Sequence, residues 1–169
     1  MTTLSIRRGA AERGLDYRWA VRRISGTALL PASPAEVYAF IADPANVPRW
    51  QSNVISSRRT SPAPTVTGST GLIEFEVMGQ RVSADTVIRE AVQDRRLVIA
   101  STVSGMSVVG TLELAAAEGG TRVTYSSEIK AASIWMVPME KMVADVAEKD
   151  LAPSLERLRA ALQATSEGG

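Results

Sequence analysis

Apolar and polar residues alternate with a period of two through most of the chain between residues 51 and 130. This alternation is typical of strands that bury one face, and turn-forming residues separate the segments at regular spacing. A further strand-like segment lies near the start of the chain. The predicted strands are 22–30, 51–60, 72–78, 81–90, 97–103, 107–114 and 122–130. With no internal repeat, this spacing predicts an antiparallel meander of short strands.

Two short helices are predicted between the first and second strands. Ser33 is followed by a proline and, three positions later, by Glu36, which is the sequence signature of a capping box. Asp43 and the proline after it predict the start of a second short helix, because a capping residue is again followed by a residue suited to a first helical turn. The second of these helices is expected to end near Trp50.

A long helix is predicted over residues 138–163, where the apolar periodicity changes to helical spacing. Met139, Val143 and Val146 form one apolar stripe in this segment. A second stripe of leucines begins at Leu151. The step from 146 to 151 interrupts the spacing of three and four residues that joins neighbouring positions of one stripe.

The segment S-P-A-E-V-Y-x-F-I-A-D-P-x-x-x-P-x-W at 33–50, with this order of elements, resembles the START-like (Bet v 1-like, SRPBCC) superfamily and its polyketide cyclase/dehydrase-type members. The resemblance covers about residues 20–163 and includes Gly68, Gly71 and the run 155–158. It implies an α+β helix-grip fold, in which a curved antiparallel sheet of about seven strands surrounds a long C-terminal helix. It also implies an internal cavity for a hydrophobic small molecule.

We expect a single helix-grip domain over residues 19–165, with a flexible tail at 166–169. Residues 1–18 carry four arginines and little periodicity. Three roles are open for this N-terminal segment. It is a flexible basic arm, an added strand or helix that packs on a partner, or a contact to an acidic partner.

The composition removes several kinds of chemistry. The 169 residues include no cysteine and no histidine, which excludes disulfides, Cys nucleophiles, Cys/His zinc sites and histidine-based triads. We therefore expect no metal site and no cofactor. The net charge of +1 argues against nucleic acid as a partner, and the chain contains no apolar run that would insert stably into a membrane. The start of the chain lacks a secretory signal, so the cytoplasm is the expected location. A homodimer is left open.

The register of the central hairpin decides which side chains face the cavity. A two-residue loop at 79–80 would pair Val77 with Val82 and Phe75 with Ala84, and this apolar face should point inward. The opposite face carries Glu76 and its acidic neighbour two residues earlier. Either these carboxylates form a solvated outer surface, or a bulge turns one of them inward as a general acid or base.

The last strand places Tyr125 and Ser127 on the inner face, beside the long helix. Tyr125 is either a core residue with its hydroxyl satisfied locally, or a catalytic hydrogen-bond donor to a ligand carbonyl. Thr86 and Ser101 are small polar residues that either orient a ligand or lie satisfied in the core.

Further candidate ligand contacts surround the beginning of the long helix. Trp135, Met139 and Met142 either pack as structure or form an adaptable cavity wall, and Val143 continues their stripe. Trp50 packs the short helices against the sheet or closes the cavity mouth, and Arg49 beside it is a candidate contact for an anionic group.

Three functional hypotheses follow. The resemblance implies an enzyme that folds a polyketide-like metabolite and promotes ring closure or loss of water, with Tyr125 and Glu76 as catalytic candidates. The second hypothesis is a carrier of a lipid, quinone or other apolar metabolite. The third is an interaction module that uses residues 1–18. A charged side chain inside the cavity would favour the enzyme over the carrier.

Overall fold

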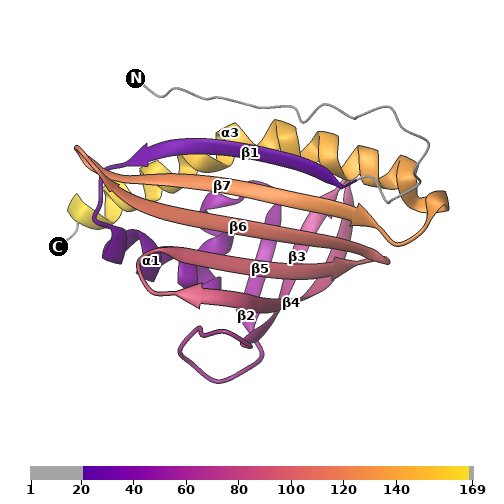
Figure 1. Ribbon diagram of the computed structural model, residues 1–169, viewed down its shortest axis with the longest axis horizontal. Helices are drawn as coiled ribbons and strands as arrows, with labels where there is room; N and C mark the ends of the chain where they lie inside the picture. Colours follow the sequence, from indigo (N-terminus) through magenta and orange to yellow (C-terminus); the bar gives the residue numbers. More distant parts are fainter. Residues whose placement is uncertain (1–20, 168–169) are drawn as a thin grey trace.

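The computed structural model describes residues 21–167, so the predicted arm at 1–18 and the last two residues of the predicted tail lie outside the described part. Figure 1 shows the order of the elements. They are β1 (Arg22–Leu30), α1 (Pro34–Ala42), η1 (Pro44–Asn46), α2 (Val47–Trp50), β2 (Val54–Arg59), β3 (Thr70–Val77), β4 (Gln80–Val92), β5 (Arg96–Val103), β6 (Met106–Ala117), β7 (Gly120–Ala131), η2 (Ile134–Met136) and α3 (Val137–Glu167).

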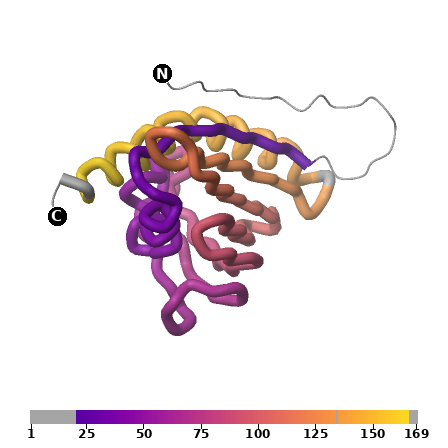
Figure 2. Tube along the Cα trace, turned by 60° about the vertical axis from the view of Figure 1, so that its left-hand side comes forward, coloured from indigo at the N-terminus to yellow at the C-terminus, as the bar shows by residue number. Residues whose placement is uncertain are grey.

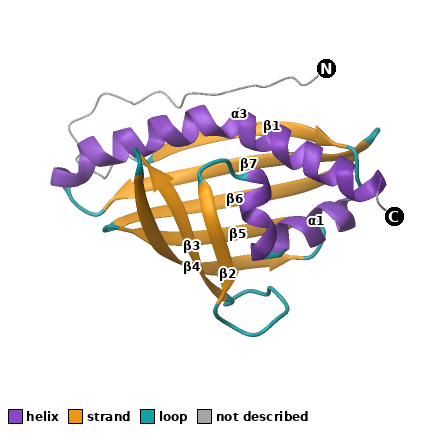
Figure 3. Ribbon diagram, turned by 180° about the vertical axis from the view of Figure 1, so that it is seen from behind, coloured by secondary structure: helices purple, strands orange, loops and turns teal. Residues whose placement is uncertain are grey.

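The seven strands form one antiparallel sheet in the order β1-β7-β6-β5-β4-β3-β2. The sheet curves around α3, and the short helices α1 and α2 lie below that helix at one end of the sheet (Figure 3). The loop between β2 and β3 projects on the side of the molecule away from α3 (Figure 2). This arrangement is the α+β helix-grip fold that the sequence predicts, so the fold prediction is confirmed.

The two helix starts are formed by the predicted caps. The Ser33 backbone nitrogen donates to Glu36 Oε2 at 2.8 Å, and the Glu36 nitrogen donates to Ser33 Oγ at 3.3 Å, which completes the capping box. The Asp43 side chain accepts from the Ala45 nitrogen at 3.0 Å. These bonds satisfy backbone donors that a helix start leaves free, which is why such short helices persist in this segment.

The predicted register of the β3–β4 hairpin is wrong by two residues. The turn is Met78–Gly79, so that Val77 pairs with Gln80 and Phe75 pairs with Val82. Met78 and Gly79 have φ values of 51° and 75°, as a two-residue type I′ turn requires, and this turn matches the twist of the strands. Because the shift is an even number of residues, each side chain stays on the face that was predicted.

The hydrophobic core lies under the C-terminal half of α3. Leu151, Leu155, Leu158 and Leu162 pack there against a cluster of buried residues from β1, the short helices and the centre of the sheet. Gly26 on β1 allows the close approach, because a Cβ at this position would lie 2.9 Å from Leu151 Cδ2. The N-terminal half of the helix is therefore left to cover a different part of the sheet.

None of the helices within residues 21–167 combines the length and the apolar character that crossing a membrane requires.

Candidate ligand-binding cavity

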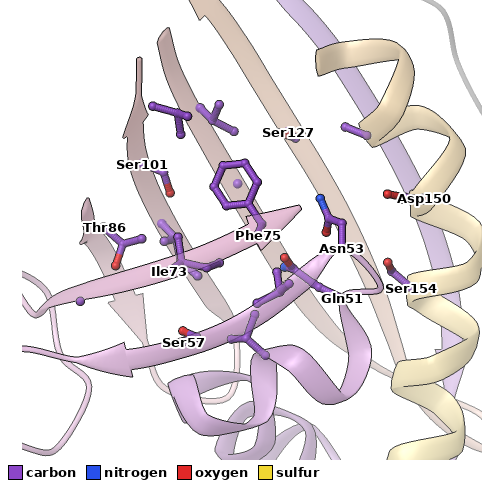
Figure 4. A pocket seen from close by; sticks show the side chains of 18 of the residues that line it. Gln51, Asn53, Ser57, Ile73, Phe75, Thr86, Ser101, Ser127, Asp150 and Ser154 are labelled. Carbon is purple, nitrogen blue, oxygen red and sulfur yellow. The ribbon is translucent and has the colours of Figure 1, made fainter. Parts of the chain in front are cut away.

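A cavity of about 620 Å³ lies between the inner face of the sheet and the first half of α3. Its volume falls in the range of pockets that bind small molecules. The wall is mostly apolar, with side chains such as Ile73, Phe75, Val108 and Val143. Figure 4 shows Phe75 near the middle of this wall, with a small number of polar side chains around it.

Most of the predicted ligand contacts lie in the cavity wall. The residues in this group are Trp50, Phe75, Thr86, Ser101, Tyr125, Ser127, Met139, Met142 and Val143. They come from α2, from strands across the sheet and from α3, so the fold brings together positions far apart in the sequence. Their roles in binding or catalysis stay predictions.

The structure places Glu76 and Trp135 outside this wall. Glu76 is exposed and lies on the opposite face of β3 from Phe75. The bulge of this region is on β2 between Val54 and Ser56, so it does not turn the side chain of Glu76 inward. Trp135 is 89% exposed in the short 3-10 helix η2, before the start of α3. Neither residue is positioned to contact a molecule in the cavity.

Tyr125 lines the cavity from β7. Its ring packs edge-on against Trp50, with ring centroids 6.4 Å apart and planes at 78°. Gly110 makes room for the tyrosine, because a Cβ there would lie 3.3 Å from the Tyr125 hydroxyl oxygen. Burial raises the pKa of Tyr125, while a hydrogen bond with Ser127 acts in the opposite direction. At neutral pH the hydroxyl is therefore a neutral donor.

Asp150 is a carboxylate in the cavity wall that the sequence analysis missed. It is half-buried on α3, and Figure 4 shows its side chain pointing from the helix toward Asn53, on the side of the cavity where Gln51 and Ser154 also lie. Among residues 21–167 it has neither an ion-pair nor a hydrogen-bond partner. The nearby Ser154 hydroxyl accepts from the Ser52 nitrogen at 3.4 Å and so joins this part of α3 to the start of β2.

The signal for Asp150 was present in the helical spacing. The stripe through Val143 and Val146 continues to Asp150 and then to Ser154 in steps of three and four residues. Apolar residues alone show an interruption at this point, because position 150 carries the charge.

Comparison with known proteins places the chain in a family. The family described as "Polyketide cyclase / dehydrase and lipid transport" matches residues 21–163. The chain belongs to this family. No curated protein matches the sequence.

Several solved structures share the fold at low sequence identity. TTHA0849 from Thermus thermophilus has a TM-score of 0.71 at 18% identity, covering 85% of this chain and 99% of that one. The Zhui aromatase/cyclase from Streptomyces sp. R1128 has a TM-score of 0.72 at 11% identity, covering 85% and 94%. Ara h 8.0201 has a TM-score of 0.65 at 13% identity, covering 86% and 99%. At these identities the likeness shows the common fold alone.

Proposed function

We propose that the chain binds an apolar, carbonyl-bearing small molecule in the cavity and promotes its ring closure and loss of water. The observation that carries this proposal is the unpartnered carboxylate of Asp150 in a mostly apolar cavity that also contains the neutral hydroxyl of Tyr125. A carboxylate without a partner beside a neutral hydroxyl gives the cavity both a proton acceptor and a proton donor, which proton transfer requires and which binding of an apolar molecule alone does not. The family description names both this kind of chemistry and lipid transport, so it supports the proposal and its alternative equally.

The proposed step uses the two polar groups in complementary roles. Asp150 removes a proton from a carbon next to one carbonyl group, and that carbon forms a bond to a second carbonyl carbon of the same molecule. The electron pair of the second C=O bond moves to its oxygen, which accepts a hydrogen bond and then a proton from Tyr125. The proton on Asp150 returns to Tyr125 through water. Asp150 then removes a second proton from the same carbon, a C=C bond forms and the hydroxyl leaves. The leaving hydroxyl takes up that proton as water, which restores Asp150 and leaves a conjugated ring.

The apolar wall contributes by holding the molecule in a folded conformation. Bringing two reacting carbons together in one bound conformer supplies much of the rate gain of an intramolecular reaction. Met139 and Met142 give the wall near the start of α3 an adaptable surface. The same adaptable surface favours the second candidate function, which is carriage of an apolar metabolite without chemistry.

A model diketone separates the two candidates. We expect the protein to accelerate conversion of 1-phenylhexane-1,5-dione to 3-phenylcyclohex-2-enone and water, followed by the absorbance of the enone. Asp150→Asn should reduce this acceleration about 100-fold, the usual contribution of a general base. Tyr125→Phe should give a smaller loss, because a bound water can replace its hydrogen bond.

The matched control is Asp145→Asn, an exposed aspartate of the same helix that lies outside the cavity wall. It should leave the rate unchanged. Binding of the neutral fluorophore N-phenyl-1-naphthylamine checks that each variant keeps its cavity. If the fluorophore binds and Asp150→Asn reacts as fast as the wild type, the catalytic proposal is wrong and carriage is favoured. Native mass spectrometry of the purified protein would then identify the class of molecule it carries.

A further inference from the structure

Arg59 is a cation in the cavity wall, at the end formed by the β2–β3 loop. It is half-buried, and it follows Ser57 on the same face of β2. Figure 4 shows Ser57 on the opposite side of the cavity from Asp150. Arg59 is the last residue of β2 and lies roughly 17 Å along the strand from Val54, which follows Asn53.

Neutral partners hold the Arg59 guanidinium in place. Its Nη2 donates to the Thr65 hydroxyl at 2.7 Å, and that hydroxyl donates to the Ala42 carbonyl at 2.7 Å. These two bonds fix the orientation of the guanidinium without neutralising its charge. Its Nε is buried and has no hydrogen-bond partner in the part of the chain that the structure describes. A buried donor without a partner costs free energy, so the described residues satisfy this guanidinium only in part.

No carboxylate of residues 21–167 lies within ion-pair distance of Arg59, although Arg22, Arg23 and Arg96 all have acidic partners. Hydroxyl groups surround this end of the cavity instead. The Ser69 hydroxyl accepts from the Val66 nitrogen at 2.9 Å, and Thr86 stands in the wall beside it. Gly71 leaves space beside Thr86 at this end of the cavity, because a Cβ at position 71 would lie 2.8 Å from Thr86 Oγ1.

Arg58 and Arg59 contribute the only cations to the described cavity wall, and Asp150 contributes its only carboxylate. We infer that Arg59 binds the carboxylate of an amphipathic ligand whose apolar body fills the cavity. This inference rests on the proposed binding function. The opposite charges at the two ends then set the direction of the ligand, because a carboxylate is attracted to Arg59 and repelled from Asp150. The carbonyl groups of the body are left near Tyr125 and Asp150.

Two competitors that differ only in their head group test the inference. N-Phenyl-1-naphthylamine serves as a neutral fluorescent reporter of the cavity, and dodecanoate or dodecan-1-ol displaces it at neutral pH. For the wild type, we expect dodecanoate to displace the reporter at about 10-fold lower concentration than the alcohol, as one charge-assisted hydrogen-bonded pair provides. Arg59→Gln should remove the preference for the acid over the alcohol. Its affinity for the neutral reporter should stay within about twofold of the wild-type value.

Arg59→Lys and Arg122→Gln are the comparison variants. Lysine keeps the charge but loses the fork of donors, so it should retain part of the preference. Arg122 is exposed on β7 away from the cavity, so Arg122→Gln removes the same net charge and should keep the full preference. A wild type that binds the reporter but shows equal displacement by acid and alcohol overturns the Arg59 inference. A wild type that does not bind the reporter overturns the proposed binding function itself.

Discussion

Tyr125 is a polar residue whose surroundings oppose its ionisation. Because burial raises its pKa, the folded protein holds the phenolic proton more tightly than the unfolded chain, in which tyrosine titrates near pH 10. The stabilising contribution of the neutral hydroxyl is therefore complete below about pH 10 and is lost as the pH rises through the folded pKa. Throughout the physiological range Tyr125 remains a donor.

This difference predicts how Tyr125→Phe changes the pH dependence of stability. The gap in free energy of unfolding between wild type and variant should be constant from about pH 7 to 9. Above about pH 10 the wild type should lose stability faster, because only its unfolded state gains a further phenolate. Urea unfolding followed by circular dichroism at several pH values measures both curves. Parallel curves up to about pH 11 would show that the Tyr125 hydroxyl is hydrated in the folded protein.

At the residue scale, strand alternation was the reliable guide to the cavity. Tyr125 and Ser127 were placed correctly because they lie within β7, where every second side chain faces the same side. Trp135 was placed incorrectly because η2 has no such period. Asp150 and Arg59 were missed for another reason. For Asp150 the signal was the helical spacing that joins it to Val143, but the stripe had been followed through apolar residues alone. For Arg59 only the opposite wall shows that the charge faces a cavity.

At the scale of elements, one buried side chain joins α3 to both neighbouring strands. Glu140, in the first turn of α3, is 1% exposed and its Oε1 lies 3.2 Å from Arg22 Nε on β1. Its Oε2 accepts from the backbone nitrogen of Ala131 on β7 at 3.3 Å. Met139 and Met142 flank Glu140, so this anchor also positions the part of α3 that covers the cavity.

Glu140→Gln should therefore lower the free energy of unfolding by about 2 kcal/mol, as expected when a buried charged hydrogen-bond acceptor is lost. The effect is moderate because Arg22 is 40% exposed and water can solvate it once its partner is neutral. Urea unfolding at neutral pH measures the change. Lys141→Gln, which breaks the exposed pair with Asp145 on the same helix, should have almost no effect. Equal losses in the two variants would contradict an anchoring role for Glu140.

The order and type of the elements and the meander of neighbouring strands followed from local signals, and the register of the β3–β4 hairpin did not. Ser33 and Glu36 predicted a helix start because the capping box is complete within four residues. The β3–β4 register instead depended on whether Met78 adopts a positive φ, a conformation that is unusual for a residue other than glycine. A turn at 79–80 was the expected solution, and the observed turn moves every pair by two residues.

At the scale of the whole molecule, α3 divides the interior into a packed part and an open part. The leucines from 151 to 162 close the core, whereas the wall from Met139 to Asp150 faces a cavity of about 620 Å³. Side chains beside an unfilled volume lack part of the packing contacts that stabilise an interior. The protein therefore gives up stability to keep the cavity, and a bound molecule restores it by mass action.

A side chain that fills part of the cavity should raise the stability of the protein and weaken its binding of ligands. Ser101 lines the cavity on β5, so Ser101→Leu adds apolar volume where packing is incomplete and removes a hydroxyl that has no hydrogen-bond partner within residues 21–167. We expect a gain of about 1 kcal/mol, or roughly 2–4 °C in Tm for a domain of this size, together with at least a roughly 10-fold weaker affinity for N-phenyl-1-naphthylamine. Differential scanning calorimetry and fluorescence titration measure the two quantities.

Thr102→Leu adds a similar side chain to the exposed face of the same strand and should change neither the Tm nor the affinity. A lower Tm for Ser101→Leu would mean that this side of the cavity has no room for the added side chain, and stability and ligand binding would then not be in opposition there.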